Sequence, residues 1–159
     1  MDLNGSNEPR YTELDQMKLV GLKCEATMEN KSAIPKLWDK FFSMQKEIRS
    51  RKSECCLGVC CDYGNESNMF SYFTGCIVKD YRSVPSGMLK MTLPRSKYAV
   101  FTHKGRLDGL EDTYDLIYHE WLPASGKKLS EDGRVLEIYD KRFTGEDNSE
   151  FDIYVPIES

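Results

Sequence analysis

The chain has 159 residues, a formal net charge of −4, 40% hydrophobic residues and 30% charged residues. A chain of this length buries one hydrophobic core, and no apolar run approaches the roughly 20 residues that a membrane-spanning helix needs. The acidic balance argues against a nucleic-acid-binding surface, which would cluster Lys and Arg. The one basic run, RSRK at 49–52, is interpreted as the solvated end of a helix.

The N-terminal segment MDLNGSNEPR is polar, whereas a secretory signal is basic and then apolar. We therefore predict a disordered or extended leader over residues 1–14 and a single domain over residues 15–159. The absence of a secretory pattern also predicts a cytoplasmic location.

The first half of the chain predicts a strand, a helix and two further strands. An apolar strand begins at Leu19, and the strands Leu57–Tyr63 and Met69–Lys79 follow the helix. The helix SAIPKLWDKFF has Ser32 as its N-cap and Pro35 in its first turn. Its apolar stripe is predicted to face the sheet and consists of Ile34, Leu37, Trp38, Phe41 and Phe42.

Four of the six cysteines lie in the segment ECCLGVCC at 54–61. Zinc sites use Cys-x2-Cys pairs from turns, whereas these residues flank and enter an alternating strand, so we predict no metal site. The adjacent Cys55 and Cys56 cannot easily bridge each other. We interpret the cysteines as reduced thiols that act as small apolar residues, and an oxidation-sensitive pair stays open as the alternative.

The same order of elements returns from Lys97, so the chain contains an internal repeat. A second helix is predicted to begin at Asp108 and Glu111 and to end at Pro123. The two helices align position by position: Leu110 on Ile34, Tyr114 on Trp38, Ile117 on Phe41 and Tyr118 on Phe42. Each half is therefore a β-α-β-β unit.

The closing strands LEIYDKRF and FDIYVPI surround the turn GEDNS. Alternation places Glu137 and Tyr139 on the face opposite Leu136 and Ile138. We predict that one face packs under the helices, and that the opposite face is a polar and aromatic surface that carries Glu137, Tyr139, Tyr154 and Tyr72. From the pattern alone, Glu137 is most simply a solvent-facing strand residue.

The motifs together resemble a known family over about residues 17–157. They are YAVFTHKG at 98–105, YHEWLPASG at 118–126, LEIYD at 136–140, DIYVPI at 152–157, IPKLWDKFF and SYFTGCIV. Their order and spacing are similar to those of GyrI-like, or AraC-type effector-binding, small-molecule-binding domains, which are related to the ligand domains of the BmrR and Rob regulators. Such regulators attach the domain to a DNA-binding module, and we interpret this chain as a stand-alone version.

The resemblance implies an α+β fold in which duplicated β-α-β-β units form one curved antiparallel sheet with two helices. It also implies a groove along the pseudo-two-fold axis, with Glu137 in that groove among aromatic residues. The predicted walls are Tyr139, Tyr72, Trp38, Trp121 and Tyr154. For Trp38 and Trp121, packing between helix and sheet is an equally good interpretation.

Three functions follow as hypotheses. The first is binding of amphipathic, cationic aromatic compounds around Glu137, because a buried carboxylate favours a cation and aromatic faces attract one. The second is a hydrolase that opens strained cyclopropane-bearing compounds, with Glu137 as general base and Tyr139 polarising a carbonyl. The third is an interaction protein that resembles gyrase inhibitors. None of the three requires a cofactor or a metal, and neither His103 nor His119 is assigned a catalytic role.

Overall fold

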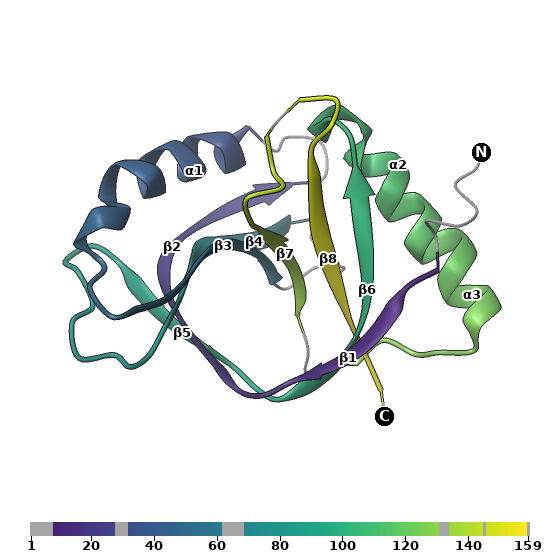
Figure 1. Ribbon diagram of the computed structural model, residues 1–159, viewed down its shortest axis with the longest axis horizontal. Coiled ribbons are helices and arrows are strands. Elements are labelled where there is room, and N and C mark those ends of the chain that lie inside the picture. Colours follow the sequence, from purple (N-terminus) through teal and green to yellow (C-terminus); the bar gives the residue numbers. More distant parts are fainter. Residues whose placement is uncertain (1–7, 28–31, 62–68, 131–133, 145, 159) are drawn as a thin grey trace.

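The computed structural model describes residues 8–27, 32–61, 69–130, 134–144 and 146–158. These residues form one curved antiparallel sheet with a helix on each half (Figure 1), which confirms the predicted α+β class. The strands are β1 (Arg10–Leu14), β2 (Met17–Thr27), β3 (Arg51–Cys61), β4 (Met69–Val78), β5 (Leu89–Leu93), β6 (Ser96–Lys104), β7 (Val135–Tyr139) and β8 (Glu150–Ile157).

The order of strands shows how the two halves meet. It is β1-β6-β8-β7-β3-β4-β2-β5, and every neighbouring pair is antiparallel. The unit β2-α1-β3-β4 supplies one side and the unit β6-α2-β7-β8 supplies the other. Strands β3 and β7 join them in the middle of the sheet, where Gly58 lies opposite Glu137.

The strand register repeats between the two halves, which confirms the predicted duplication. The same step along the chain relates the equivalent strand positions. The pairs Val20–Cys76 and Gly58–Thr74 of the first half correspond to the pairs Ala99–Val155 and Glu137–Ile153 of the second half.

Two edge strands were not part of the predicted repeat. Arg10–Leu14, inside the segment predicted as a disordered or extended leader, form the extended strand β1 and pair with β6. Residues 1–7 of that predicted leader lie outside the described residues. Strand β5 pairs with β2 at the other edge of the sheet.

The first helix, α1 (Ala33–Met44), begins directly after Ser32 as predicted and continues into the 3-10 turn Gln45–Glu47. Its residues Leu37 and Phe41 are buried against β2 and β4. Phe42 is 49% exposed, so its prediction as a core residue was wrong.

The second helix does not end at Pro123 as predicted. A 3-10 turn (Leu107–Gly109) leads into α2 (Leu110–Asp115), a π-helical stretch (Leu116–Trp121) and α3 (Leu122–Ser125), and the helix ends at Gly126, whose φ is +75°. Proline disrupts a helix interior because it lacks an N–H and its ring crowds the preceding turn. The wider π stretch before Pro123 changes that hydrogen-bond pattern, so the helix continues.

The helices cover one face of the sheet, and Glu137 lies on that same face. Helix α1 packs on Val20 and Leu22, and the second helix packs on Ala99 and Phe101. The other face forms a separate cluster, which includes Leu19, Leu57, Val59, Phe73, Tyr98 and Leu136 and is closed by residues of β1 and β5. The predicted alternation is therefore correct, but the prediction that Glu137 faces away from the helices was wrong. None of the helices among the described residues is long and apolar enough to cross a membrane.

Candidate functional site

Glu137 is the central residue of the candidate site. It lies on β7, in the middle of the sheet, and only 5% of it is exposed to solvent. A buried carboxylate is costly unless hydrogen-bond partners replace its lost water. Three phenol hydroxyls supply those partners.

The three phenols share the two oxygens of the Glu137 carboxylate. Tyr72 and Tyr139 donate to Oε1 at 2.9 and 2.8 Å, and Tyr114 donates to Oε2 at 2.6 Å. The Trp38 indole N–H donates in turn to the Tyr72 hydroxyl at 3.2 Å. The network therefore holds the carboxylate through neutral donors.

Both halves of the fold contribute to this network. Trp38 comes from α1 and Tyr72 from β4, whereas Tyr114 comes from α2 and Tyr139 from β7. Trp38 and Tyr114 occupy the positions that align in the two helices, so each helix reaches toward the centre of the sheet from its own side. The site therefore spans the pseudo-two-fold axis.

The three tyrosines remain protonated far above neutral pH. Burial raises the pKa of Tyr72, Tyr114 and Tyr139 well above the ordinary range, and the negative charge of Glu137 raises each pKa further. Phenols in this state act as hydrogen-bond donors to the carboxylate at any physiological pH.

Gly58 provides the space that the network occupies. A Cβ atom at this position would lie 2.0 Å from the Tyr72 hydroxyl and 3.1 Å from Glu137 Oε1. Real Cβ atoms do not approach other atoms as closely as 2.0 Å, so any side chain here must displace Tyr72. At the paired positions Gly58 and Glu137, only β7 has room for a side chain.

Thr74 lies on the other side of Gly58 from Glu137, in the neighbouring strand β4. Its side chain is fully buried, and within the described part of the chain its hydroxyl has no hydrogen-bond partner. Buried polar groups are normally hydrogen-bonded, and an exception needs an explanation. This hydroxyl, two strands from the strand of Glu137, can form a hydrogen bond with a water or a ligand.

Pairs of aromatic rings extend the site along both helices. The Trp38 ring lies 5.5 Å from Phe42 and 5.2 Å from Tyr139, and Tyr114 stacks on Tyr118 at 6.1 Å. Such rings present negative faces that attract cations.

The structure brings four of the six predicted site residues together. Glu137, Tyr139, Tyr72 and Trp38 share the network described above. Trp121 packs edge-on against Phe101 at 5.0 Å, in the cluster under the second helix.

The predicted shared face of Tyr154 and Glu137 was wrong. Tyr154 pairs with Leu136 in the β7–β8 register, so its side chain lies on the far face of the sheet, next to Tyr98. Tyr154 lies 17 positions after Glu137, but the hairpin between their strands interrupts the alternation, so only the register could assign its face.

Two residues of the site were not predicted. Tyr114 could have been found, because the helix alignment places it on Trp38, which was a predicted site residue. Gly58 could not have been found from local pattern, because its role depends on the cross-strand contact with Glu137.

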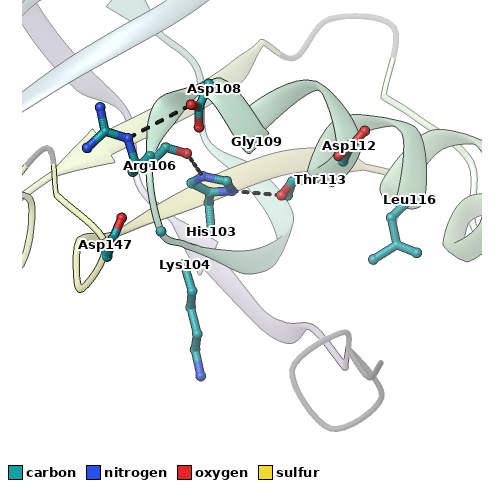
Figure 2. A pocket seen from close by; sticks show the side chains of 10 residues that line it. His103, Lys104, Arg106, Asp108, Gly109, Asp112, Thr113, Leu116 and Asp147 are labelled. Carbon is teal, nitrogen blue, oxygen red and sulfur yellow. Dashed lines mark hydrogen bonds and ion pairs between the residues drawn. The ribbon is translucent and has the colours of Figure 1, made fainter.

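A cavity of about 430 Å³ lies away from Glu137, where β6 meets the start of the second helix and the β7–β8 hairpin (Figure 2). Buried His103 lies in its wall: Nε2 donates to the Arg106 carbonyl at 2.9 Å, and Nδ1 lies 2.7 Å from the Thr113 hydroxyl. These contacts tie the second helix to β6 one residue before Tyr114. The role of His103 is therefore to position the helix.

His119 is mostly exposed, with Nδ1 3.7 Å from Asp115. Within the described residues, no group of three or more His, Cys, Asp and Glu side chains could hold a metal ion.

Comparison with known proteins assigns this chain to a family. The family description of the GyrI-like small molecule binding domain matches residues 7–158, and the chain belongs to this family. Among curated proteins, it is 32% identical over 151 residues to the transcriptional regulator BrlR of Pseudomonas aeruginosa. That match covers 93% of this chain and 54% of BrlR, so the chain spans about half the length of this relative.

Solved structures share the fold at low identity. SAV2435 bound to tetraphenylphosphonium has a TM-score of 0.78 at 17% identity, over 96% of this chain and 94% of that one. A hydrolase from Listeria innocua has a TM-score of 0.54 at 9% identity, over 95% of this chain and 92% of that one. The chain is thus a small-molecule-binding domain of the GyrI-like family.

Proposed function

We propose that this domain binds amphipathic, cationic aromatic compounds, with Glu137 as the residue that selects the charge. The buried Glu137 carboxylate with its three phenol donors supports this function. All three donors are neutral, so they satisfy the hydrogen-bonding needs of the carboxylate and leave its negative charge in place.

A cationic ligand supplies the positive charge that this network lacks. Inside a protein the attraction between opposite charges is much stronger than in water, because the local dielectric constant is lower. A lipophilic cation also loses little hydration on entering an aromatic site, so its desolvation costs less than that of an ammonium group. The chemistry of tetraphenylphosphonium, which the structural relative SAV2435 binds, supports this class of ligand.

The aromatic residues around Glu137 favour a flat or multi-ring ligand. The rings of Trp38, Tyr139 and Tyr114 belong to the same network as the carboxylate. Stacking and cation–π contacts are tolerant of exact ligand geometry, since every ring has a similar negative face. We therefore expect selection by charge and aromatic character more than by a hydrogen-bonding pattern.

A pair of ions of the same shape and opposite charge tests the proposal. We expect saturable quenching of tryptophan fluorescence by tetraphenylphosphonium and none by tetraphenylborate. In Glu137→Gln, affinity for the cation should fall by about tenfold or more, because the charge is lost while the shape is kept. The matched control is Tyr154→Phe, which removes a phenol hydroxyl on the far face of the sheet and should bind like the parent chain.

Binding of both ions with equal affinity, or equal binding of the cation by the parent chain and Glu137→Gln, would overturn the proposed role of Glu137. Either result would favour uncharged ligands or a protein partner such as gyrase.

Hydrolysis of strained cyclopropane-bearing compounds is the second candidate function. The Tyr139 hydroxyl on Glu137 and the fold shared with a Listeria innocua hydrolase favour it. Binding rests on the buried carboxylate, its three phenol donors and the surrounding rings, whereas hydrolysis rests on one hydroxyl and a shared fold, so we rank binding first. Mass spectrometry of the incubated compound separates the two functions: a binder returns it unchanged, and a hydrolase returns a product heavier by one water that Glu137→Gln does not form.

A further inference from the structure

Two cysteines that lie far apart in the sequence face each other across the sheet. Cys56 of β3 is the register partner of Cys76 of β4. Both side chains lie in the cluster under α1, where Cys76 is fully buried and Cys56 is half-buried. In this structure both are reduced thiols.

The register places the two residues within reach of a disulfide. Directly opposite residues of antiparallel strands have Cα atoms about 4.5 or 5.5 Å apart, and disulfides accept Cα separations of about 4.4–6.8 Å. The Cβ atoms of such a pair must approach by about 1 Å to form the bond. The register of β3 shifts between Arg51 and Cys56, so the regular pairing of β3 with β4 begins at this pair.

The two thiols have different surroundings. Nη2 of Arg51 lies 3.5 Å from the Cys56 sulfur, so a cation stands beside the more accessible thiol. Burial raises the pKa of Cys76 to about 11, and burial also raises the pKa of Cys56, although Arg51 opposes that rise. Cys56 is therefore the thiol that an oxidant reaches first, and Cys76 is the buried thiol that then reacts with the oxidised Cys56.

We propose that Cys56 and Cys76 form a reversible oxidation site, in which a hydroperoxide converts the two thiols into a cross-strand disulfide. The Cys56 sulfur attacks a peroxide oxygen, the O–O bond breaks, and the leaving alcohol or water carries away the Cys56 proton. The Cys76 sulfur then attacks the resulting sulfenic acid, the S–O bond breaks, and water leaves with the Cys76 proton. The thiols lose two electrons in total, and the hydroperoxide gains them.

The register connects this pair to the Glu137 site. Cys56 is also the partner of Tyr139 across the β3–β7 pair, and the Tyr139 hydroxyl bonds Glu137. Disulfide formation draws Cys56 toward β4 and so loosens its contact with β7. On the basis of the proposed function, we expect oxidation to weaken tetraphenylphosphonium binding severalfold and a dithiol reductant to restore it.

The test treats the reduced full chain with hydrogen peroxide and maps the cross-linked peptides under non-reducing conditions. We expect an intramolecular bond between Cys56 and Cys76, with loss of two thiols in a thiol titration and recovery after reduction. Cys56→Ser should abolish the bond, whereas Cys55→Ser, which changes the adjacent residue, should keep it. Mapping of the parent chain needs no variant, so the result does not depend on how Cys76→Ser folds.

A bond between any other cysteines, a bond between two chains, or sulfonic acid without a disulfide would overturn the proposal. The mapping does not involve a ligand. If the Cys56–Cys76 bond forms and tetraphenylphosphonium binding does not weaken, the link to Glu137 is wrong, and the oxidation site still stands.

Discussion

The two halves of this domain have the same strand register and different chemistry at equivalent positions. At the centre of the sheet the first half has Gly58 and the second half has Glu137. The surrounding positions also differ: Tyr72 of the first half corresponds to Phe151 of the second half, and Cys60 corresponds to Tyr139. The backbone repeats, but the carboxylate occurs once.

The reason for this difference is the shared space near the axis. Because β3 and β7 are neighbours, side chains at their paired central positions would both point into one volume, and a Cβ at Gly58 already overlaps the Tyr72 hydroxyl. A duplicated fold with an axis through its sheet can place only one large side chain there. The site therefore depends on the asymmetry of its two central residues.

Restoring the symmetry should cause the largest loss of stability. In Gly58→Glu, a second carboxylate would face Glu137 and displace Tyr72. We expect the free energy of unfolding to fall by about 3–5 kcal/mol, as for other buried charges without a partner. Chemical denaturation of the variant and the parent chain measures this difference.

Two smaller changes separate sterics from charge in that result. Gly58→Ala adds only the overlap with Tyr72 and should lower the free energy of unfolding by about 1–3 kcal/mol. Gly109→Ala, whose Cβ would make only an ordinary 3.9 Å contact with His103, should have a smaller effect than either. If Gly58→Glu is no less stable than Gly58→Ala, the two carboxylates do not share the space inferred here.

Removing one phenol of the first half tests how far the halves depend on each other. Tyr72→Phe removes a donor to Glu137 and an acceptor for Trp38 together. Because both groups are then left short of a partner, we expect a loss of about 1–3 kcal/mol in the free energy of unfolding and a shift in tryptophan emission. A similar loss in Tyr154→Phe, on the far face of the sheet, would contradict a special role for Tyr72.

The repeat and its helices could be predicted from the sequence because they depend on local periodicity. The alignment of Tyr114 on Trp38 came from helical spacing, and both residues reach the site. Glu137 was selected by resemblance to a family, whereas its strand pattern alone suggested solvent exposure. Local spacing therefore predicted the repeat and its helices, whereas the burial of Glu137 could be recognised only from the tertiary structure.

The features that could not be predicted depend on contacts between distant segments. Alternation assigned Glu137 and Leu136 to opposite faces, but it could not show which face the helices cover. The partnership of Cys56 with Cys76 follows only from the β3–β4 register, and the passage of the second helix beyond Pro123 follows from a π stretch that has no simple sequence signature.

Alkaline titration should reveal a smaller difference, between tyrosines beside Glu137 and a buried tyrosine remote from it. Burial raises the pKa of Tyr98 as it does that of Tyr139, but the charge of Glu137 adds to the rise only for Tyr139. In Glu137→Gln, phenolate absorbance assigned to Tyr139 should therefore appear at lower pH than in the parent chain, while that of Tyr98 is unchanged. Tyr139→Phe and Tyr98→Phe assign the two signals.

The direction of the accompanying change in stability follows from proton binding. Below the ordinary tyrosine pKa of about 10, the folded and unfolded chains both keep the phenol protons, and the stabilisation is complete. Above that pH the unfolded chain releases protons that the folded chain retains, so the free energy of unfolding falls as pH rises. Glu137→Gln should lessen this fall, because part of the raised pKa is lost with the charge. An equal fall in both chains would mean that burial alone sets the tyrosine pKa values, and that the carboxylate charge is screened from the phenols that bind it.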